Sequence, residues 1–252
     1  MPVRWTRHAL RDLLHARGIR LKKSLGQSFL VDENFLDALA RDTGATKDDV
    51  VVEIGSGPGN LTDHLARRAA KVWAFDLDPR LVDLSRELLA DRSNVTIVHA
   101  DGAEFERHLS AEGRTLRVVS NLPYSDWKRL LLALLSTRLS VASYTVMVQT
   151  DVYDRLRAEP GTREYGSMAV VVQSACEMRR LRRAGKELFF PVPRVDSTVF
   201  EIVRKEVLDF TGLETRLRTL FAQRRKKSPA AGGKRIEKLA PSELLALARR
   251  GD

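Results

Sequence analysis

Short, unbroken apolar runs recur through most of the chain, and segments in which apolar residues follow helical spacing separate them. Runs of this kind are typical of strands that are buried on both faces of a parallel sheet. They predict strands at residues 50–54, 71–75, 95–99, 117–119 and 141–148, with a less regular last strand at 198–203. Strands and helices in alternation imply right-handed crossovers, so the pattern predicts an α/β fold with a doubly wound, mostly parallel sheet.

The remaining segments divide the chain into three parts. Residues 1–23 are predicted to form a basic, partly helical arm, residues 24–205 the α/β domain, and residues 206–252 a small helical appendage. Residues 228–233 are rich in Gly, Pro and Ala and interrupt the appendage. Residues 166–176 stay ambiguous, because their run of valines suits a helix or a strand.

Three glycines at alternate positions, Gly55, Gly57 and Gly59, follow the first strand. A strand, a glycine loop and a helix form the first unit of a nucleotide-binding domain, in which backbone N–H groups hold the ligand. The spacing is not the Gly-x-Gly-x-x-Gly of dinucleotide sites, because residue 60 is Asn. Glu53 is expected to face the ligand, where it would repel a pyrophosphate and suit a cationic group. S-Adenosylmethionine meets these requirements; a tight turn that binds nothing is the alternative.

Acidic residues follow the next two predicted strands. Asp76 comes after the second strand and is placed to accept hydrogen bonds from both ribose hydroxyls. Asp78 precedes Pro79, which suits the first turn of a helix, so we expect Asp78 to be a helix cap. Asp101 follows the third strand, where it would accept from the adenine amine, although an Asp before Gly can also simply form a turn.

Asn121, Leu122, Pro123 and Tyr124 leave the fourth predicted strand and are the candidates for the chemical step. The amino group of adenine or cytosine is a poor nucleophile, because its lone pair is delocalised into the ring. Acceptors on the Asn121 side chain and the Leu122 backbone would aim that lone pair and stabilise the developing positive charge. Pro123 adds no competing N–H, and the ring of Tyr124 can stack on an extruded base. The alternative is an ordinary strand-end turn.

The charge of the chain points away from a small-molecule enzyme and towards one that acts on nucleic acid. Lys and Arg number 43 against 33 Asp and Glu, and the excess lies in residues 1–23, 179–186 and 224–235. Such clusters suggest a polyanionic partner, although a basic run can also be only a solvated surface. The residues expected to bind RNA are Arg179, Arg180, Arg182, Arg183, Arg224, Arg225, Lys226 and Lys227.

The cysteine, histidine and apolar residues bear on the cellular location of the protein and on metal or membrane binding. Cys176 is the only cysteine, so no internal disulfide is possible, and the five histidines lack the spacing of metal ligands. We see no secretory signal and no apolar run long enough to span a membrane. We therefore expect a cytoplasmic protein with no metal site and no membrane contact.

Several motifs between residues 22 and 205 match one family. They are Ser24-Leu25-Gly26-Gln27-Ser28-Phe29-Leu30, Glu53 to Thr62, Asp76-Leu77-Asp78, Asp101-Gly102, Asn121 to Tyr124, Gln149, Tyr165-Gly166 and Pro193-Arg194-Val195-Asp196-Ser197. The glycine loop alone would indicate only a methyltransferase, but together with the first and fifth of these motifs it is specific. On these residues the chain resembles the ribosomal RNA adenine N6-dimethyltransferases, which include the small-subunit dimethylase and the macrolide-resistance enzymes that act on large-subunit RNA.

The resemblance implies S-adenosylmethionine as the cofactor and adenine N6 in ribosomal RNA as the methyl acceptor. It also implies that Gln27, Phe29 and Leu30 close over the cofactor. Phe189, which we expect to be exposed in a rigid loop, would sandwich the target base opposite Tyr124. The small-subunit branch adds two methyl groups to each of two adjacent adenines in a 3′-terminal hairpin loop. The expected partner is therefore ribosomal RNA within a small-subunit assembly particle, bound by a monomer.

Two departures from the family pattern bear on the substrate. After Tyr124 the family usually continues with Asn-Ile-Ser-Thr or similar residues, whereas here Ser125-Asp126-Trp127-Lys128-Arg129 follows beside the base pocket. The region after residue 205 is also shorter than in the small-subunit enzymes, although it keeps segments 221–226 and 234–239. The alternatives are an RNA-binding assembly factor without catalysis and a large-subunit adenine methylase that confers macrolide resistance. The basic clusters disfavour a small-molecule methyltransferase.

Overall fold

The computed structural model describes residues 5–22, 25–109, 114–227, 229 and 232–249. Parts of several sequence predictions lie outside these residues. They are positions 1–4 and 23 of the basic arm, Ser24 of the first family motif, positions 110–113 of the α/β domain, positions 228, 230 and 231 of the stretch that interrupts the appendage, and positions 250–252 at its end.

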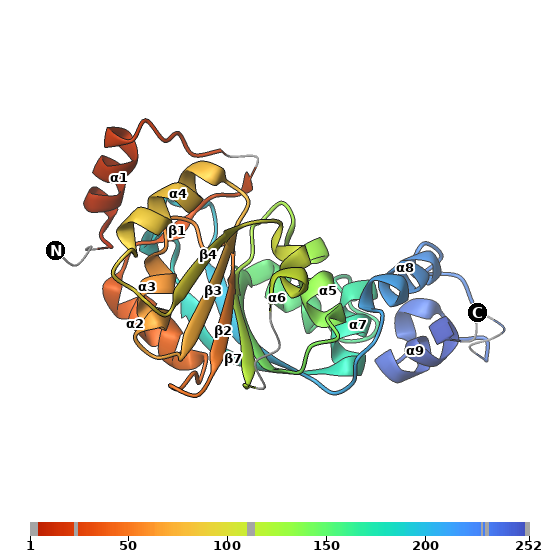
Figure 1. Cartoon of the computed structure of the whole chain (residues 1–252). Helices are drawn as coiled ribbons and strands as arrows, with labels where there is room; N and C mark the ends of the chain where they lie inside the picture. Colours follow the sequence, from red (N-terminus) through yellow and green to blue (C-terminus); the bar gives the residue numbers. More distant parts are fainter. Residues whose placement is uncertain (1–4, 23–24, 110–113, 228, 230–231, 250–252) are drawn as a thin grey trace.

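In the described part of the chain, a seven-stranded sheet forms the centre of the fold (Figure 1). Its strands, in spatial order, are β4 (Val95–His99), β3 (Lys71–Asp76), β2 (Val50–Ile54), β5 (Leu116–Asn121), β6 (Val141–Gln149), β9 (Ser197–Arg204) and β7 (Cys176–Ala184). The first five are parallel, whereas β9 runs antiparallel to β6 and β7 antiparallel to β9. The predicted doubly wound, mostly parallel α/β sheet is confirmed. Its strand order reverses between β2 and β5, the switch point at which such sheets bind ligands.

Helices cover both faces of the sheet. α2 (Glu33–Asp42), α3 (Asn60–Ala66) and α4 (Pro79–Leu88) lie on one face, and α5 (Trp127–Ser136), α6 (Thr150–Leu156) and α7 (Ser167–Ala175) lie on the other (Figure 1). Successive side chains of a strand point to opposite faces of the sheet, so each strand contributes side chains to the apolar core on either face. In β2, Val51 packs with α2 and α3, whereas Val52 belongs to the cluster that contains the leucines of α5. No described helix has both the length and the apolar character that a membrane crossing requires.

The ambiguous segment 166–176 forms helix α7, and strand β7 follows it directly. The apolar pattern did not predict β7. This strand lies at the edge of the sheet, pairs with β9, and exposes Arg179, Arg180 and Arg183. An edge strand has one side and part of its faces in water, so it does not need the continuous apolar run of a buried strand.

The C-terminal helices α8 (Phe210–Phe221) and α9 (Pro241–Arg249) pack against α7 and against each other. Phe210, Leu217 and Leu244 are buried in the same apolar cluster as the strands of the sheet. The predicted helical appendage is therefore present, and its core is continuous with that of the α/β part. The domain limit after residue 205 stays a prediction.

The N-terminal arm packs beside the carboxyl ends of the central strands. Helix α1 (Arg7–Ala16) is capped by Thr6 and lays Leu10 and Leu14 against α4 and Phe29. The chain then enters β1 (Phe29–Leu30), which pairs antiparallel with β8 (Phe189–Phe190) in a small second sheet. Residues 25–30 are thereby held against the central sheet. Short 3-10 helices lie at η2 (Gly102–His108), η3 (Lys186–Leu188) and η5 (Ile236–Lys238).

Candidate active site

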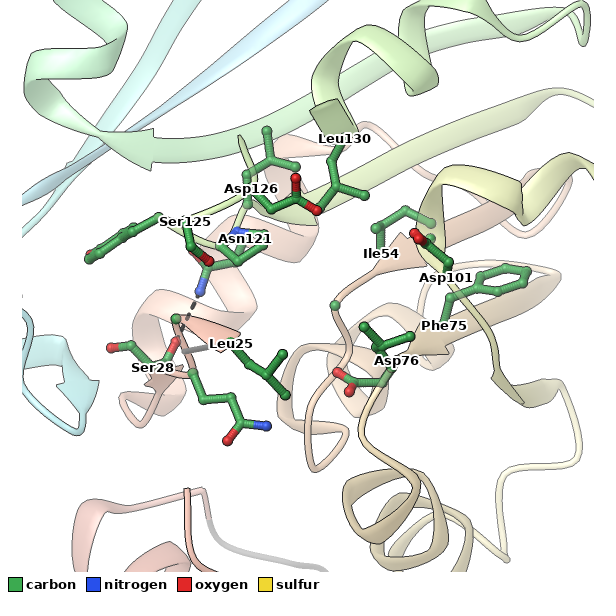
Figure 2. A pocket seen from close by; sticks show the side chains of 18 of the residues that line it. Leu25, Ser28, Ile54, Phe75, Asp76, Asp101, Asn121, Ser125, Asp126 and Leu130 are labelled. Atoms are coloured by element: carbon green, nitrogen blue, oxygen red, sulfur yellow. Dashed lines mark hydrogen bonds between the residues drawn. The ribbon is translucent and has the colours of Figure 1, made fainter. Parts of the chain in front are cut away.

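A pocket opens at the carboxyl ends of β2, β3 and β5, where open α/β sheets bind their ligands (Figure 2). Figure 2 shows Asp76 and Asp101 on one side of the pocket and Asn121, Ser125 and Asp126 on the other. The lining comes from the N-terminal loop, the strand ends and the segment after β5. Its residues are Leu25, Gly26, Gln27, Ser28, Phe29, Ile54, Gly55, Phe75, Asp76, Leu77, Asp101, Gly102, Asn121, Leu122, Pro123, Tyr124, Ser125, Asp126, Arg129 and Leu130.

Most of the residues predicted from the sequence lie in this lining, and some do not. The predicted residues that line the pocket are Gln27, Phe29, Gly55, Asp76, Asp101, Asn121, Leu122, Pro123 and Tyr124. The predicted residues outside the lining are Leu30, Glu53, Gly57, Gly59 and Phe189.

The glycine loop shapes the pocket, and the N–H groups of three of its residues donate within the protein. The N–H groups of Gly55 and Ser56 donate to the Phe75 carbonyl at 2.8 and 3.0 Å, and that of Gly57 donates to the Asp76 carboxylate at 2.7 Å. Gly57 has a positive φ of 57°, and a Cβ there would lie 2.5 Å from the ring of Phe29. The expectation that these backbone groups hold the ligand stays a prediction, and in this structure the N–H groups of Gly55, Ser56 and Gly57 have acceptors within the protein.

Glu53 does not face the pocket, so that prediction is also wrong. Ile54 lines the pocket, and the alternation along β2 turns Glu53 to the opposite face, towards α3. The Glu53 side chain is buried and accepts a hydrogen bond from Thr62 Oγ1 at 2.5 Å. Burial raises the pKa of Glu53 to about 8, against the effect of that hydrogen bond. The Glu53 carboxyl group therefore meets α3 and not the pocket.

Asp76 places its carboxylate at the pocket from the end of β3. Its two oxygens accept from the N–H groups of Gly57 at 2.7 Å and Asp78 at 2.8 Å. Burial raises the pKa of Asp76, although these bonds oppose the shift. The Leu77 N–H also hydrogen-bonds this carboxylate, which has about four lone-pair sites and so retains some capacity to accept from a ligand. Asp78 is the N-cap of α4, as predicted, and accepts from Gln27 Nε2 at 3.0 Å, which ties the N-terminal loop to this edge.

Asp101 forms a turn and also lines the pocket. It is the N-cap of η2 and accepts from the Ala103 N–H at 2.9 Å, so the turn predicted as the alternative is present. Gly102 allows this turn to lie close to β2, because a Cβ there would lie 2.3 Å from Ile54 Cγ2. The close approach brings the Asp101 carboxylate to the same pocket as Asp76.

Asn121 is the last residue of β5, and a contact with the N-terminal loop orients its side chain. Asn121 Nδ2 donates to the Ser28 carbonyl at 3.1 Å, the bond drawn in Figure 2. A carbonyl can pair only with the amide nitrogen, so the side-chain oxygen of Asn121 remains an acceptor at the pocket. Gly26 packs on the same motif, since a Cβ there would lie 3.1 Å from the Tyr124 nitrogen. The family motif at residues 24–30 and the motif at residues 121–124 are therefore in contact.

Tyr124 lines the pocket with a half-buried ring. Its hydroxyl lies 3.4 Å from Ser197 Oγ, and burial raises the pKa of the phenol. Leu122 is buried and donates its N–H to the Met147 carbonyl at 3.0 Å. These two contacts anchor the loop after β5 to β6 and β9.

Phe189 is not exposed, contrary to our prediction. It is paired with Leu30 between β8 and β1, and both side chains are buried in the core under α2 and α3. Only 1% of Phe189 is accessible to solvent, so its ring offers no face to a base in this conformation. The sequence showed two adjacent phenylalanines between loops, but the pairing with β1 decides which way each one points.

The segment after Tyr124 contributes residues that the sequence analysis did not assign. Asp126 and Arg129 line the pocket, and Arg129 forms ion pairs with Asp126 at 2.5 Å and with Asp101 at 3.0 Å. The spacing of Asp126 and Arg129, three residues apart at the start of a helix, could have predicted the first pair. The second pair joins separate loops and has no signal in the sequence.

The basic residues expected to bind RNA fall into two groups. Four are in ion pairs: Arg179 with Glu201, Arg182 with Asp42, Arg183 with Asp196 and Arg224 with Glu237. The others, Arg180, Arg225, Lys226 and Lys227, are exposed. In the described part of the chain, no cluster of three His, Cys, Asp or Glu side chains is arranged to hold a metal ion.

Comparisons with known proteins show the family of this chain. Residues 18–231 match a family described as ribosomal RNA adenine dimethylase. Proteins named ribosomal RNA small subunit methyltransferase A from Bacillus mycoides (strain KBAB4) and Bacillus cereus (strain B4264) are each 38% identical over 231 residues, which cover 88% of this chain and 79% of the relative.

Two solved structures show the same fold. A dimethyladenosine transferase from Plasmodium falciparum has a TM-score of 0.75 and 21% identity, covering 87% of this chain and 95% of that one. The 23S rRNA methyltransferase ErmE has a TM-score of 0.62 and 24% identity, covering 88% of this chain and 98% of that one. With the family match over most of its length and relatives that are 38% identical over 231 residues, this chain belongs to the ribosomal RNA adenine dimethylase family.

Proposed function

We propose that this chain transfers methyl groups from S-adenosylmethionine to the N6 amine of adenine in small-subunit ribosomal RNA, with two methyl groups on each of two adjacent adenines in the 3′-terminal hairpin loop. The observation that carries the proposal is the single pocket that Asn121 to Tyr124 share with Asp76 and Asp101. The relatives named ribosomal RNA small subunit methyltransferase A favour the small subunit over the large one.

The lining of the pocket suits a cationic ligand that carries hydrogen-bond donors. Its charged residues are the carboxylates of Asp76, Asp101 and Asp126 and the guanidinium of Arg129. This excess of negative charge would repel a phosphate. S-Adenosylmethionine fits such a lining, and when bound it supplies a methyl group activated by a positively charged sulfur. In this proposal Asp76 accepts from the ribose hydroxyls and Asp101 from the adenine amine.

Asn121 and Leu122 would act on the target adenine. The Asn121 side-chain oxygen and the Leu122 carbonyl accept from the two amine hydrogens, which directs the nitrogen lone pair and stabilises the charge that develops on nitrogen. The bond from Asn121 Nδ2 to Ser28 holds the amide in place before the substrate arrives. No strong base is required, because the proton can leave to water after the transfer.

Tyr124 would stack on the extruded base. Base–aromatic stacking contributes ~1–3 kcal/mol per base, and adenines in a hairpin loop are less costly to extrude than paired ones. Phe189 cannot share this role while it is buried in the core, so we assign base stacking to Tyr124 alone.

Exposed cations would hold the RNA. We assign phosphate contacts to Arg180, Arg225, Lys226 and Lys227, because their side chains are exposed and can neutralise phosphates. The proposal extends to a monomer that acts in the cytoplasm on a small-subunit assembly particle.

The test is tritiated methyl transfer to under-methylated small ribosomal subunits, with under-methylated large subunits as the second substrate. We expect label in the small subunit, two adjacent stops on primer extension across the 3′ hairpin, and dimethyladenosine on nucleoside digestion. Transfer to large subunits alone would support the macrolide-resistance alternative. The absence of transfer to either subunit would contradict the enzymatic proposal and favour a non-catalytic assembly factor.

A further inference from the structure

Arg129 occupies a position that is unfavourable for a cation. It lies in the first turn of α5, where the N-terminal end of the helix dipole is positive and favours negative side chains. It is also half exposed, so the hydrophobic core does not require it. Local disagreements of this kind concentrate at functional sites, where another interaction offsets their cost.

Two carboxylates from separate loops surround the Arg129 guanidinium. Nη1 lies 3.0 Å from Asp101 Oδ2, and Nη2 donates to Asp101 Oδ1 at 3.2 Å. Nε and Nη2 donate to Asp126 Oδ2 at 2.8 and 2.5 Å. Asp126 is the N-cap residue of α5, yet its side chain makes no capping hydrogen bond. Its carboxylate thus pairs with Arg129 in place of the helix N-terminus.

The contact with Arg129 holds Asp101 in one orientation. Asp101 Oδ1 accepts from the Ala103 N–H at 2.9 Å, and the guanidinium spans both carboxylate oxygens. Burial opposes ionisation of Asp101, but the hydrogen bonds from Arg129 and Ala103 outweigh it and hold its pKa below the ordinary value. An ionised carboxylate can only accept hydrogen bonds. A ligand edge that meets Asp101 must therefore donate.

We infer that Arg129 is a positioning residue that orients Asp101, so that the cofactor pocket selects a nucleoside with an exocyclic amine over one with a carbonyl at the same position. The inference rests on the proposed function, because it takes the cofactor to be an adenine nucleoside. The sequence at 125–129 differs from the usual family pattern, and the inference gives this segment a role. Lys could not replace Arg129, since its single point charge cannot contact two carboxylates in a fixed plane.

The test compares the binding of S-adenosylhomocysteine and S-inosylhomocysteine by calorimetry. The second compound carries a carbonyl in place of the adenine amine and a hydrogen on ring nitrogen N1, and the rest of the molecule is the same. We expect the wild type to prefer the adenine form by about tenfold to a hundredfold, the range for one hydrogen bond to a charged group. Arg129→Gln and Arg129→Lys should each reduce this ratio to a few-fold. Arg86→Gln removes an exposed arginine that pairs with Asp83 three residues away in α4, outside the pocket lining, and should leave the ratio unchanged.

A double-mutant cycle separates positioning from general support of the pocket. In an Asp101→Ala background there is no carboxylate to orient, so adding Arg129→Gln should leave the ratio where Asp101→Ala sets it. The inference is overturned if Arg129→Gln weakens both compounds equally, if it leaves the ratio intact, or if it lowers the ratio further without Asp101. A wild type that binds both compounds equally also overturns it. A wild type that binds neither compound contradicts the proposed function instead.

Discussion

Replacing Asn121 with Ala removes the acceptor proposed for the reacting amine and one hydrogen bond that holds the N-terminal loop. The bond to Ser28 is 3.1 Å long and partly buried, so its loss should cost the fold ~1 kcal/mol. The side-chain oxygen acts mainly when charge develops on the adenine nitrogen. Removing one preorganised group of this kind lowers rates by ~10²–10³. We therefore expect a large loss of methyl transfer with a small loss of stability.

The measurement is single-turnover tritiated methyl transfer to under-methylated small subunits, together with calorimetric cofactor binding and thermal unfolding. Asn94→Ala is the matched control, because Asn94 Nδ2 donates to the carbonyls of Ala66 and Ala69 at 2.8 and 3.1 Å, away from the pocket. The control should lose similar stability and keep its rate. If Asn121→Ala transfers methyl groups as fast as the wild type, or if both variants slow equally, the role assigned to Asn121 is refuted.

Three further predictions concern the cofactor, the RNA and the glycine loop. Asp76→Ala should weaken S-adenosylmethionine binding about tenfold to a hundredfold by calorimetry, since it removes hydrogen bonds to a charged group; an unchanged affinity would place the ribose contact elsewhere. The logarithm of the RNA association constant should fall linearly with the logarithm of the salt concentration, and an affinity that does not depend on salt would count against phosphate contacts. Reversing the charges of Arg225 and Lys226 should weaken RNA binding without changing cofactor affinity. Burial raises the pKa of Glu53 in the folded protein from 4.5 to about 8. Between pH 4.5 and about 8 the folded protein therefore binds more protons than the unfolded one, so its free energy of unfolding falls as the pH rises through this range. In urea unfolding, Glu53→Gln should abolish that part of the pH dependence, and an unaltered profile would show that another group causes it.

The sequence by itself predicted the class of fold, six of the seven strands of the central sheet and nine of the residues that line the pocket. Runs such as Val50–Ile54 are buried on both faces, and that requirement is local enough to be visible in the residues. Asp78 could be recognised as a cap because Pro79 follows it, and capping depends on neighbours in the chain. Asp76, Asp101 and Asn121 could be placed together because the carboxyl ends of parallel strands meet at one edge of a sheet.

Tertiary structure alone decided which way individual side chains point and which distant residues meet. Alternation along β2 separates Glu53 from Ile54, but only the helix packed on each face determines that Ile54 reaches the pocket and Glu53 meets Thr62. The pairing of β1 with β8 buries Phe189 against Leu30, and the partners come from opposite ends of the domain.

The same holds for the contact between Arg129 and Asp101. Asp101 lies in a turn after β4 and Arg129 in the first turn of α5, and nothing local relates the two. Periodicity and capping depend on neighbouring residues, so they can be recognised in the chain itself. The orientation of a side chain at the pocket depends on elements packed from elsewhere in the chain, and it is set only when the whole sheet and its helices assemble.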